Sequence, residues 1–317
     1  MSVTNPKDFG EISKSLERIG LPGRDSYDIP TSEKRFPDGA QYRFEVSLVE
    51  RLTTVEAVID EMRKRKKAKV HRIICCNLGT SYLTDDELKA MAKAAHDAKL
   101  GVVLAPGPNK DVGATQKYTS VGVMQGNRYR GMDQLAFIIA DIKRCIDLGF
   151  RAFLVVDEGE LWTLNELRKI GEIPKEIKFK WSTLTGHGNP PAAKLLESLG
   201  ANTINPRADL TLPILAAMRK VVSVPIDIFM SNPESFGGFN RFWEVPEIIR
   251  VTSPVYFKVE NGSSDAAFGS PHADQAFVAY LAREKVRYTE IVQGIIEKYY
   301  PEAKTSEIGT EDSIPVV

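Results

Sequence analysis

Charged residues alternate with apolar ones in several short, β-rich runs of this chain. Successive side chains of a strand point to opposite faces, so one face of each run is apolar and the other is charged. The charged faces carry Arg43, Glu45, Asp157, Lys180, Asp227, Lys258 and Glu260. Carboxylates and amines that share a site shift one another's pKa values, as general acid–base catalysis requires. These residues are therefore the candidate catalytic centre, provided that the strands bring them together.

The amines and carboxylates of this set have different expected roles. Lys258 and Lys180 are the candidate acid–base or Schiff-base groups, because an amine can act as an acid, a base or a nucleophile. Glu45, Asp227 and Glu260 are expected to tune the amines or to hold a metal. Charges inside a protein must pair with one another, a metal or a ligand. A buried salt-bridge network without chemistry is the alternative, since ion pairs also perturb ionisation.

A divalent metal such as Mg²⁺, Mn²⁺ or Zn²⁺ is a second interpretation of the same acidic residues. Its candidate ligands are Glu45, Asp157, Asp227 and Glu260. The sequence has no His-x-His spacing, so the cofactor stays unknown. His187 follows the run 177–183 in a glycine-rich turn, where it is a candidate acid–base group. A histidine that only orders the turn is the alternative.

Residues near the strand ends are expected to bind the substrate. They are Arg43, Asn77, Arg128, Arg130, Asn205, Arg241 and His272. The segment 107–130 ends with two of these arginines and is long enough to act as a lid that clamps an anion; a solvated loop is the alternative. The pair Gly237-Gly238 lies in the segment 231–242, where backbone amides can cradle an anion.

Eight β-rich runs alternate with eight helical patterns. The predicted strands are 42–49, 71–78, 101–106, 152–158, 177–183, 202–206, 225–230 and 254–260. The predicted helices lie near 54–68, 84–99, 131–148, 160–170, 190–199, 211–222, 243–251 and 271–299. Thr84 and Glu87 have the spacing of a capping box, and Asn189-Pro190 places a cap residue before a first-turn proline. This regular alternation predicts a (β/α)8 TIM-type barrel.

The connections between the predicted elements differ with direction. Helix-to-strand links are short, whereas the strand-to-helix links 107–130, 231–242 and 261–270 are long. The long loops therefore gather at the carboxyl ends of the strands, where barrel enzymes build their active sites. The expected domains are an N-terminal arm (1–41), the barrel (42–301) and a flexible C-terminal tail (302–317).

Charge and hydropathy exclude several classes of protein. The 317 residues include 42 basic and 42 acidic ones, so bulk charge predicts binding neither to nucleic acid nor to anionic membranes. No apolar run is long enough to span a bilayer, and residues 1–20 lack the apolar stretch of a secretory signal. Three cysteines do not make a disulfide framework. We therefore expect a cytoplasmic protein.

Several segments together resemble bacterial barrel proteins of the peptidase family U32 type, over about residues 35–300. The segments that carry the resemblance are 36–43, 157–158, 199–203, 209–212, 224–227, 237–239 and 253–258. The resemblance implies a (β/α)8-like barrel and a peptidase or hydrolase activity. Some members of the family that the sequence resembles instead hold an iron–sulfur cluster on four cysteines. This chain has only Cys75, Cys76 and Cys145, so no iron–sulfur cluster is expected.

The leading functional prediction is a barrel enzyme that acts on a small polar or anionic substrate by acid–base chemistry, similar to U32 peptidase-like hydrolases. A Schiff-base or metal-dependent lyase or isomerase is one alternative. A non-catalytic binding or accessory subunit is another. The expected partner is a small-molecule substrate. A homo-oligomer stays open, because the apolar residues of the last helix, 271–299, either pack on the barrel or serve an interface.

Overall fold

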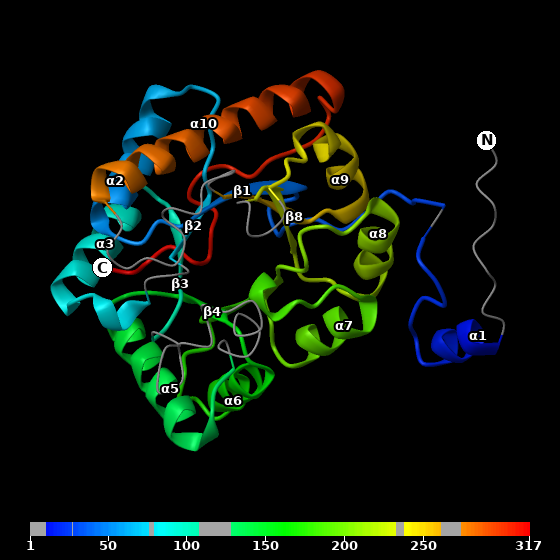
Figure 1. The fold of residues 1–317 in the computed structure, drawn as a ribbon, viewed down its shortest axis with the longest axis horizontal. Coiled ribbons are helices and arrows are strands. Elements are labelled where there is room, and N and C mark those ends of the chain that lie inside the picture. The colour runs from blue at the N-terminus through cyan, green and yellow to red at the C-terminus, as the bar shows by residue number, and fades with distance from the viewer. Residues whose placement is uncertain (1–10, 27, 76–78, 108–127, 233–237, 261–273) are drawn as a thin grey trace.

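Eight parallel strands close into a barrel in chain order (Figure 1). The structure is a computed structural model, and it describes residues 11–26, 28–75, 79–107, 128–232, 238–260 and 274–317. The strands are β1 (Tyr42–Ser47), β2 (Arg72–Cys75), β3 (Gly101–Leu104), β4 (Ala152–Val155), β5 (Lys178–Trp181), β6 (Thr203–Ile204), β7 (Ile226–Ser231) and β8 (Val255–Val259). β8 pairs with β1 in parallel and closes the sheet. The predicted (β/α)8 barrel is confirmed.

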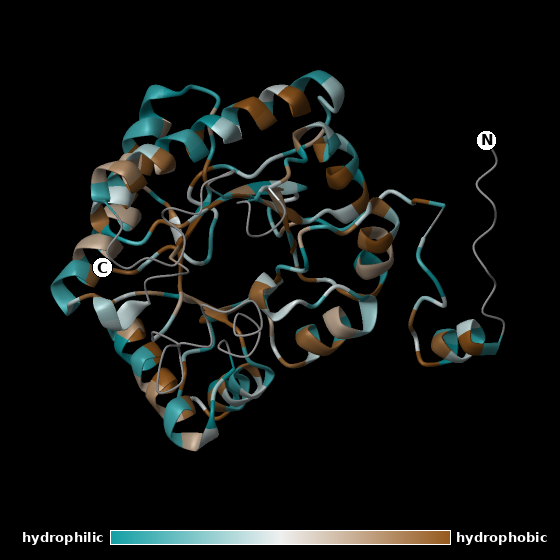
Figure 2. Ribbon diagram, in the orientation of Figure 1, coloured by the Kyte–Doolittle hydropathy of each residue, from teal (hydrophilic) through white to brown (hydrophobic). Residues whose placement is uncertain are grey.

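Helices surround the barrel as predicted. They are α2 (Leu52–Lys64), α3 (Asp85–Asp97), α5 (Gly131–Asp147), α6 (Glu158–Lys169), α7 (Pro190–Ser198), α8 (Leu212–Val221), α9 (Val245–Thr252) and α10 (Gln275–Tyr299). The side chain of Thr84 accepts a hydrogen bond from Glu87 N and starts α3, and Asn189 caps α7 in the same way. Figure 2 shows hydrophilic and hydrophobic residues together on these helices, as expected where only one face packs on the sheet.

The barrel interior has an apolar side and a charged side. Ile74, Val103, Ala152 and Leu154, from β2, β3 and β4, form a small buried cluster of their own. Phe153 and Val155 instead join the large core between the strands and the helices. The register predicted for the run 152–158 is therefore wrong by one residue. As a consequence Asp157 does not face the barrel axis, and its side chain caps α6 by accepting from Glu160 N.

The described segment that precedes β1, residues 11–41, lies on the outside of the barrel. The helix α1 (Glu11–Arg18) stands apart from the barrel in Figure 1. The arm then runs along α8 and α9, where Ser26 N donates to Pro213 O and Ser32 N donates to Arg250 O. It reaches β1 at the amino ends of the strands. Within the part of the chain described, no helix could cross a membrane.

The C-terminal segment 302–317, expected to be a flexible tail, is instead held against the amino ends of the strands. Thr305 forms a parallel bridge with Tyr42, and Val102 N donates to Ser313 O at 3.0 Å. Two glycines make room for it. A Cβ on Gly101 would lie 2.3 Å from Ser313 Oγ, and one on Gly149 would lie 2.2 Å from Val316 O. The segment therefore closes the bottom of the barrel.

Candidate active site

Four charged side chains form a closed ion network on the barrel axis. They come from β1, β2, β5 and β7 and are Glu45, Arg72, Lys180 and Asp227. Arg72 Nε donates to Glu45 Oε2 at 2.5 Å, and its Nη2 donates to Asp227 Oδ1 at 3.1 Å. Lys180 Nζ lies 3.2 Å from Glu45 Oε1 and also pairs with Asp227. All four side chains are buried, and two cations balance two carboxylates. The predicted convergence of charge on the axis is thus present in the structure.

Burial and charge act against each other in this network. Burial by itself would raise the pKa of Glu45, but the charges of Arg72, Lys180 and Lys258 outweigh it and lower the pKa to about 2. Burial lowers the pKa of Lys180, although the carboxylates of Asp227 and Glu45 oppose this shift. Glu45 and Asp227 are therefore both paired with Arg72 and Lys180 of the same network.

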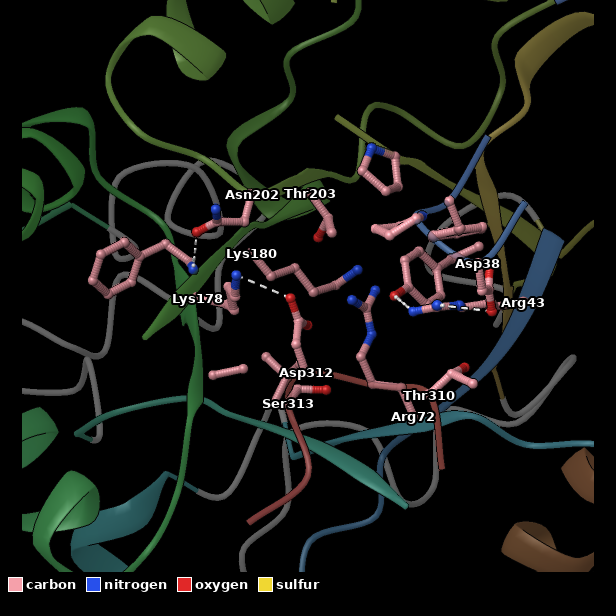
Figure 3. A pocket seen from close by; sticks show the side chains of 17 residues that line it. Asp38, Arg43, Arg72, Lys178, Lys180, Asn202, Thr203, Thr310, Asp312 and Ser313 are labelled. Carbon is pink, nitrogen blue, oxygen red and sulfur yellow. Dashed lines mark hydrogen bonds and ion pairs between the residues drawn. The ribbon is translucent and has the colours of Figure 1, made fainter. Parts of the chain in front are cut away.

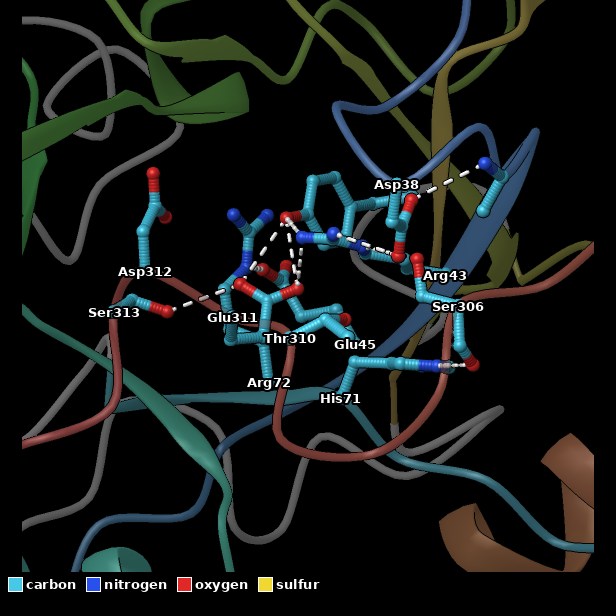
Figure 4. A network of polar contacts seen from close by, with 12 residues as sticks. Asp38, Arg43, Glu45, His71, Arg72, Ser306, Thr310, Glu311, Asp312 and Ser313 are labelled. Atoms are coloured by element: carbon cyan, nitrogen blue, oxygen red, sulfur yellow. Dashed lines mark hydrogen bonds and ion pairs between the residues drawn. The ribbon is translucent and has the colours of Figure 1, made fainter.

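At the amino ends of the strands, Arg43 faces the C-terminal segment (Figure 4). Its Nη1 lies 2.9 Å from Glu311 Oε1, and its Nε donates to Ser306 Oγ at 2.7 Å. The hydroxyl of Tyr256 donates to the same carboxylate at 2.9 Å. Burial raises the pKa of Glu311 despite the neighbouring arginines. Arg43, expected to bind substrate, is thus occupied by the chain's own carboxylate.

At the carboxyl ends of the strands, Lys258 is grouped with Asn205 and Glu260. Lys258 Nζ lies 3.3 Å from Asn205 Oδ1, 3.4 Å from Glu260 Oε1 and 4.6 Å from the centre of the Phe229 ring. Asn205 Nδ2 donates to Asp227 O at 2.9 Å, which turns the amide oxygen toward the amine. Glu260 Oε2 is buried and has no hydrogen-bond partner among the described residues. This is the end where barrel enzymes act.

A second group of predicted residues lies at the rim, after β4 and β5. His187 Nε2 is 3.0 Å from Glu158 Oε1, and the same carboxylate pairs with Arg128. The His187 ring packs edge-on against Trp181. Burial lowers the pKa of His187, although the charge of Glu158 opposes this. The structure therefore joins His187 and Arg128 through a carboxylate that the sequence analysis did not select.

The other predicted site residues are dispersed. Arg241 is buried in the link between β7 and α9, where it pairs with Glu244 at 2.7 Å and donates to Ala208 O at 3.3 Å. Arg130 precedes α5, and its backbone N–H donates to Gln134. Asn77 and His272 lie outside the described residues. Among the described members of the predicted substrate-binding set, Asn205 lies against Lys258.

The acidic residues considered as metal ligands do not share one site. Glu45 and Asp227 are neutralised by Arg72 and Lys180, Asp157 caps α6, and Glu260 lies beside Lys258. Among the residues whose placement is described, no group of three or more His, Cys, Asp or Glu side chains could hold a metal ion.

Arg72, Glu311 and Glu160 are important residues that the sequence analysis missed. Arg72 links two carboxylates at the centre of the network, and Glu311 reaches the barrel from outside its predicted bounds. Glu160 is fully buried under β4, where burial raises its pKa to about 8. Only Arg72 had a signal, since it alternates with inward-facing Ile74 in β2.

Comparisons with known proteins leave the function open. No family model matches the sequence, and no curated protein matches it, so membership of the U32 family stays a prediction. Solved structures with a similar fold include the YdjI aldolase from Escherichia coli K12, with 15% identity, a TM-score of 0.49 and coverage of 83% of this chain and 94% of that one. A U32 peptidase has 16% identity, a TM-score of 0.43 and coverage of 74% and 98%. A D-psicose 3-epimerase from Clostridium cellulolyticum H10 has 10% identity, a TM-score of 0.43 and coverage of 79% and 99%. The barrel is shown by the strand topology, and these likenesses do not specify its chemistry.

Proposed function

We propose that the chain is an enzyme that acts on a small polar or anionic carbonyl compound at the carboxyl ends of the strands, with Lys258 as the reacting amine. The observation that carries the proposal is the position of Lys258. Its side chain is 5% exposed and lies beside Asn205, Glu260 and the Phe229 ring, at the end of the barrel where active sites form.

Lys258 is a better candidate than Lys180 because of its position. Lys180 is held between two carboxylates, Glu45 and Asp227, inside the ion network. Lys258 lies at the carboxyl ends of the strands, 3.3 Å from Asn205 Oδ1 and 3.4 Å from Glu260 Oε1. Its amine is therefore placed where a barrel enzyme holds its base or nucleophile.

Glu260 is the proposed proton carrier beside this amine. Its Oε1 faces Lys258, while Oε2 is buried without a hydrogen-bond partner in the described part of the chain. A buried acceptor without a partner is costly, by about 1–3 kcal/mol, and a substrate hydroxyl that filled it would recover this cost. A carboxyl group next to an amine can then pass a proton to or from the substrate.

Two forms of chemistry fit this pair, and one experiment separates them. The wild-type protein is incubated with a panel of small carbonyl acids and sugar phosphates in D₂O, with and without borohydride. A Schiff base leaves a borohydride-stable adduct, which peptide mapping places on Lys258. General-base chemistry instead exchanges the proton next to the carbonyl for deuterium, which NMR detects without any adduct.

The control variant replaces Lys178, a lysine that lies at the opposite end of the barrel from Lys258. We expect Lys258→Met to abolish the adduct or the exchange, and Lys178→Met to keep it, because Lys178 lies at the amino end of β5. Glu260→Gln should slow the reaction while leaving the fold intact. A wild-type protein that shows neither adduct nor exchange across the panel contradicts the proposed role of Lys258.

A further inference from the structure

A cavity of about 420 Å³ lies at the amino ends of the strands, opposite to Lys258 (Figure 3). Its walls come from the start of the barrel strands, and the C-terminal segment passes along one side. The polar side chains that line it and bear on its chemistry are Arg72, Lys178, Lys180, Thr203 and Asp312. Four of these five side chains carry hydrogen-bond donors, and the fifth, Asp312, is an acid.

Three of the donors are close together because of strand register. Lys178 and Lys180 are two residues apart in β5, so both point to the inner face. Thr203 of β6 is the register partner of Lys180. Figure 3 shows Lys178, Lys180 and Thr203 around the same space. A ligand group placed there meets two ammonium groups and a hydroxyl.

Thr203 is the independent sign of a missing ligand. Its side chain is nine-tenths buried, with 8% of the residue exposed, and Oγ1 has no hydrogen-bond partner in the described structure. Arg72 also lines the cavity, and its Nε and Nη2 are used by Glu45 and Asp227. Buried polar groups in proteins are normally satisfied, so the unpartnered hydroxyl of Thr203 points to an absent ligand group.

One of these donors, Lys178, is already paired with an acidic side chain of the chain itself, that of Asp312. Asp312 Oδ2 lies 2.9 Å from Lys178 Nζ. The Asp312 side chain is 63% exposed and that of Lys178 is 32% exposed, so this ion pair is weak and easily exchanged. The other acid on the cavity wall, Asp38, is held on the far side by Arg43 and by the backbone N–H of Ala40. Displacing Asp312 therefore leaves room for a different anion.

We propose that this cavity is a binding site for a small anion, the carboxylate or phosphate group of a metabolite. The anion accepts hydrogen bonds from Lys178, Thr203 and Arg72, and it replaces the carboxylate of Asp312. Exchanging one anion for another keeps the charge of the cavity unchanged, so no uncompensated charge is buried. The site is separate from the proposed reaction at Lys258, because it lies at the other end of the barrel.

The test is titration calorimetry with inorganic phosphate and then with succinate, at constant ionic strength. We expect saturable binding of at least one of them to the wild-type protein, and the comparison between them shows which anion the site prefers. Lys178→Met should weaken binding about ten-fold, the effect of losing one charge-assisted hydrogen bond. Asp312→Asn should strengthen it several-fold, because the competing carboxylate is gone.

Two further variants control for a loss of stability and for the general effect of removing a lysine charge. Thr203→Val keeps the shape of the side chain and loses no hydrogen bond of the described structure. It should weaken binding about five-fold without lowering the urea midpoint. Lys175→Met removes an exposed lysine three residues before Lys178 and should bind like the wild type. The proposal is overturned if neither anion binds, or if Lys178→Met and Thr203→Val bind as tightly as the wild type.

Discussion

Removing the carboxylate of Asp227 is expected to destabilise the protein strongly. This side chain is fully buried and faces both Arg72 and Lys180. In Asp227→Asn, two buried cations are left with the single carboxylate of Glu45. Breaking a buried pair by removing one partner costs about 3–5 kcal/mol, because the other charge stays uncompensated. We therefore expect the free energy of unfolding at pH 7 to fall by that amount.

The assay is urea denaturation, in which a lower midpoint with an unchanged slope reports a loss of stability. The matched control is Asp97→Asn. Asp97 pairs with Lys93 at 2.8 Å on the surface of α3, and both side chains are more than half exposed, so its loss should leave the urea midpoint nearly unchanged. Lys180→Met combined with Asp227→Asn restores the charge balance, and the double variant should lose less than the sum of the single losses. A cost below about 1 kcal/mol for Asp227→Asn, or strict additivity, would refute the claim that these charges are buried and coupled.

Two pH dependences follow from buried groups outside the candidate active site. His71 is neutral in the fold, because burial lowers its pKa to about 4, and its Nδ1 accepts from Phe44 N. The unfolded chain binds this proton first, near pH 6.5, so stability is full above about pH 6.5 and decreases by about 3 kcal/mol as the pH falls to about 4. Urea midpoints across this range should fall more steeply in the wild type than in His71→Gln; an equal slope in the variant contradicts the assignment. Burial raises the pKa of Glu160 to about 8, so its contribution is present below about pH 4.5 and is lost as the pH rises toward about 8. Glu160→Gln should therefore match the wild type near pH 5 and be the more stable of the two near pH 9, and thermal melts that show no such gain would disprove it.

Strand alternation predicted the charged interior because apolar residues occupied every second position of four strands. In β1, β5, β7 and β8 this pattern left a single inward face for Glu45, Lys180, Asp227 and Lys258. Because all the strands run in the same direction, the sequence also predicted that Lys258 and Glu260 lie at the carboxyl ends of the strands. The local sequence pattern is thus sufficient to predict which side chains face inward where one face of a strand is apolar and the other is not.

The same reasoning failed where the pattern was uniform. The strand β4 is apolar on both faces, so alternation could not decide between Leu154 and Phe153 as the inward residue, and Asp157 was misplaced with them. In β2, two polar residues precede the apolar run. His71 and Arg72 therefore competed for the inward position, and only the structure shows that Arg72 takes it.

The C-terminal segment could not be predicted because its attachment depends on contacts that are distant in the sequence. Glu311 reaches Arg43 across 268 positions, and Ser313 and Val316 fit only because Gly101 and Gly149 lack side chains. Arg43 is buried and its other carboxylate partner, Asp38, is farther away at 3.5 Å, so the loss of Glu311 would leave the guanidinium poorly compensated. The charged bottom of the barrel therefore requires the segment that covers it. The chain after α10 is for this reason a structural part of the barrel, and the expectation of a free tail overlooked a charge that the strands alone do not balance.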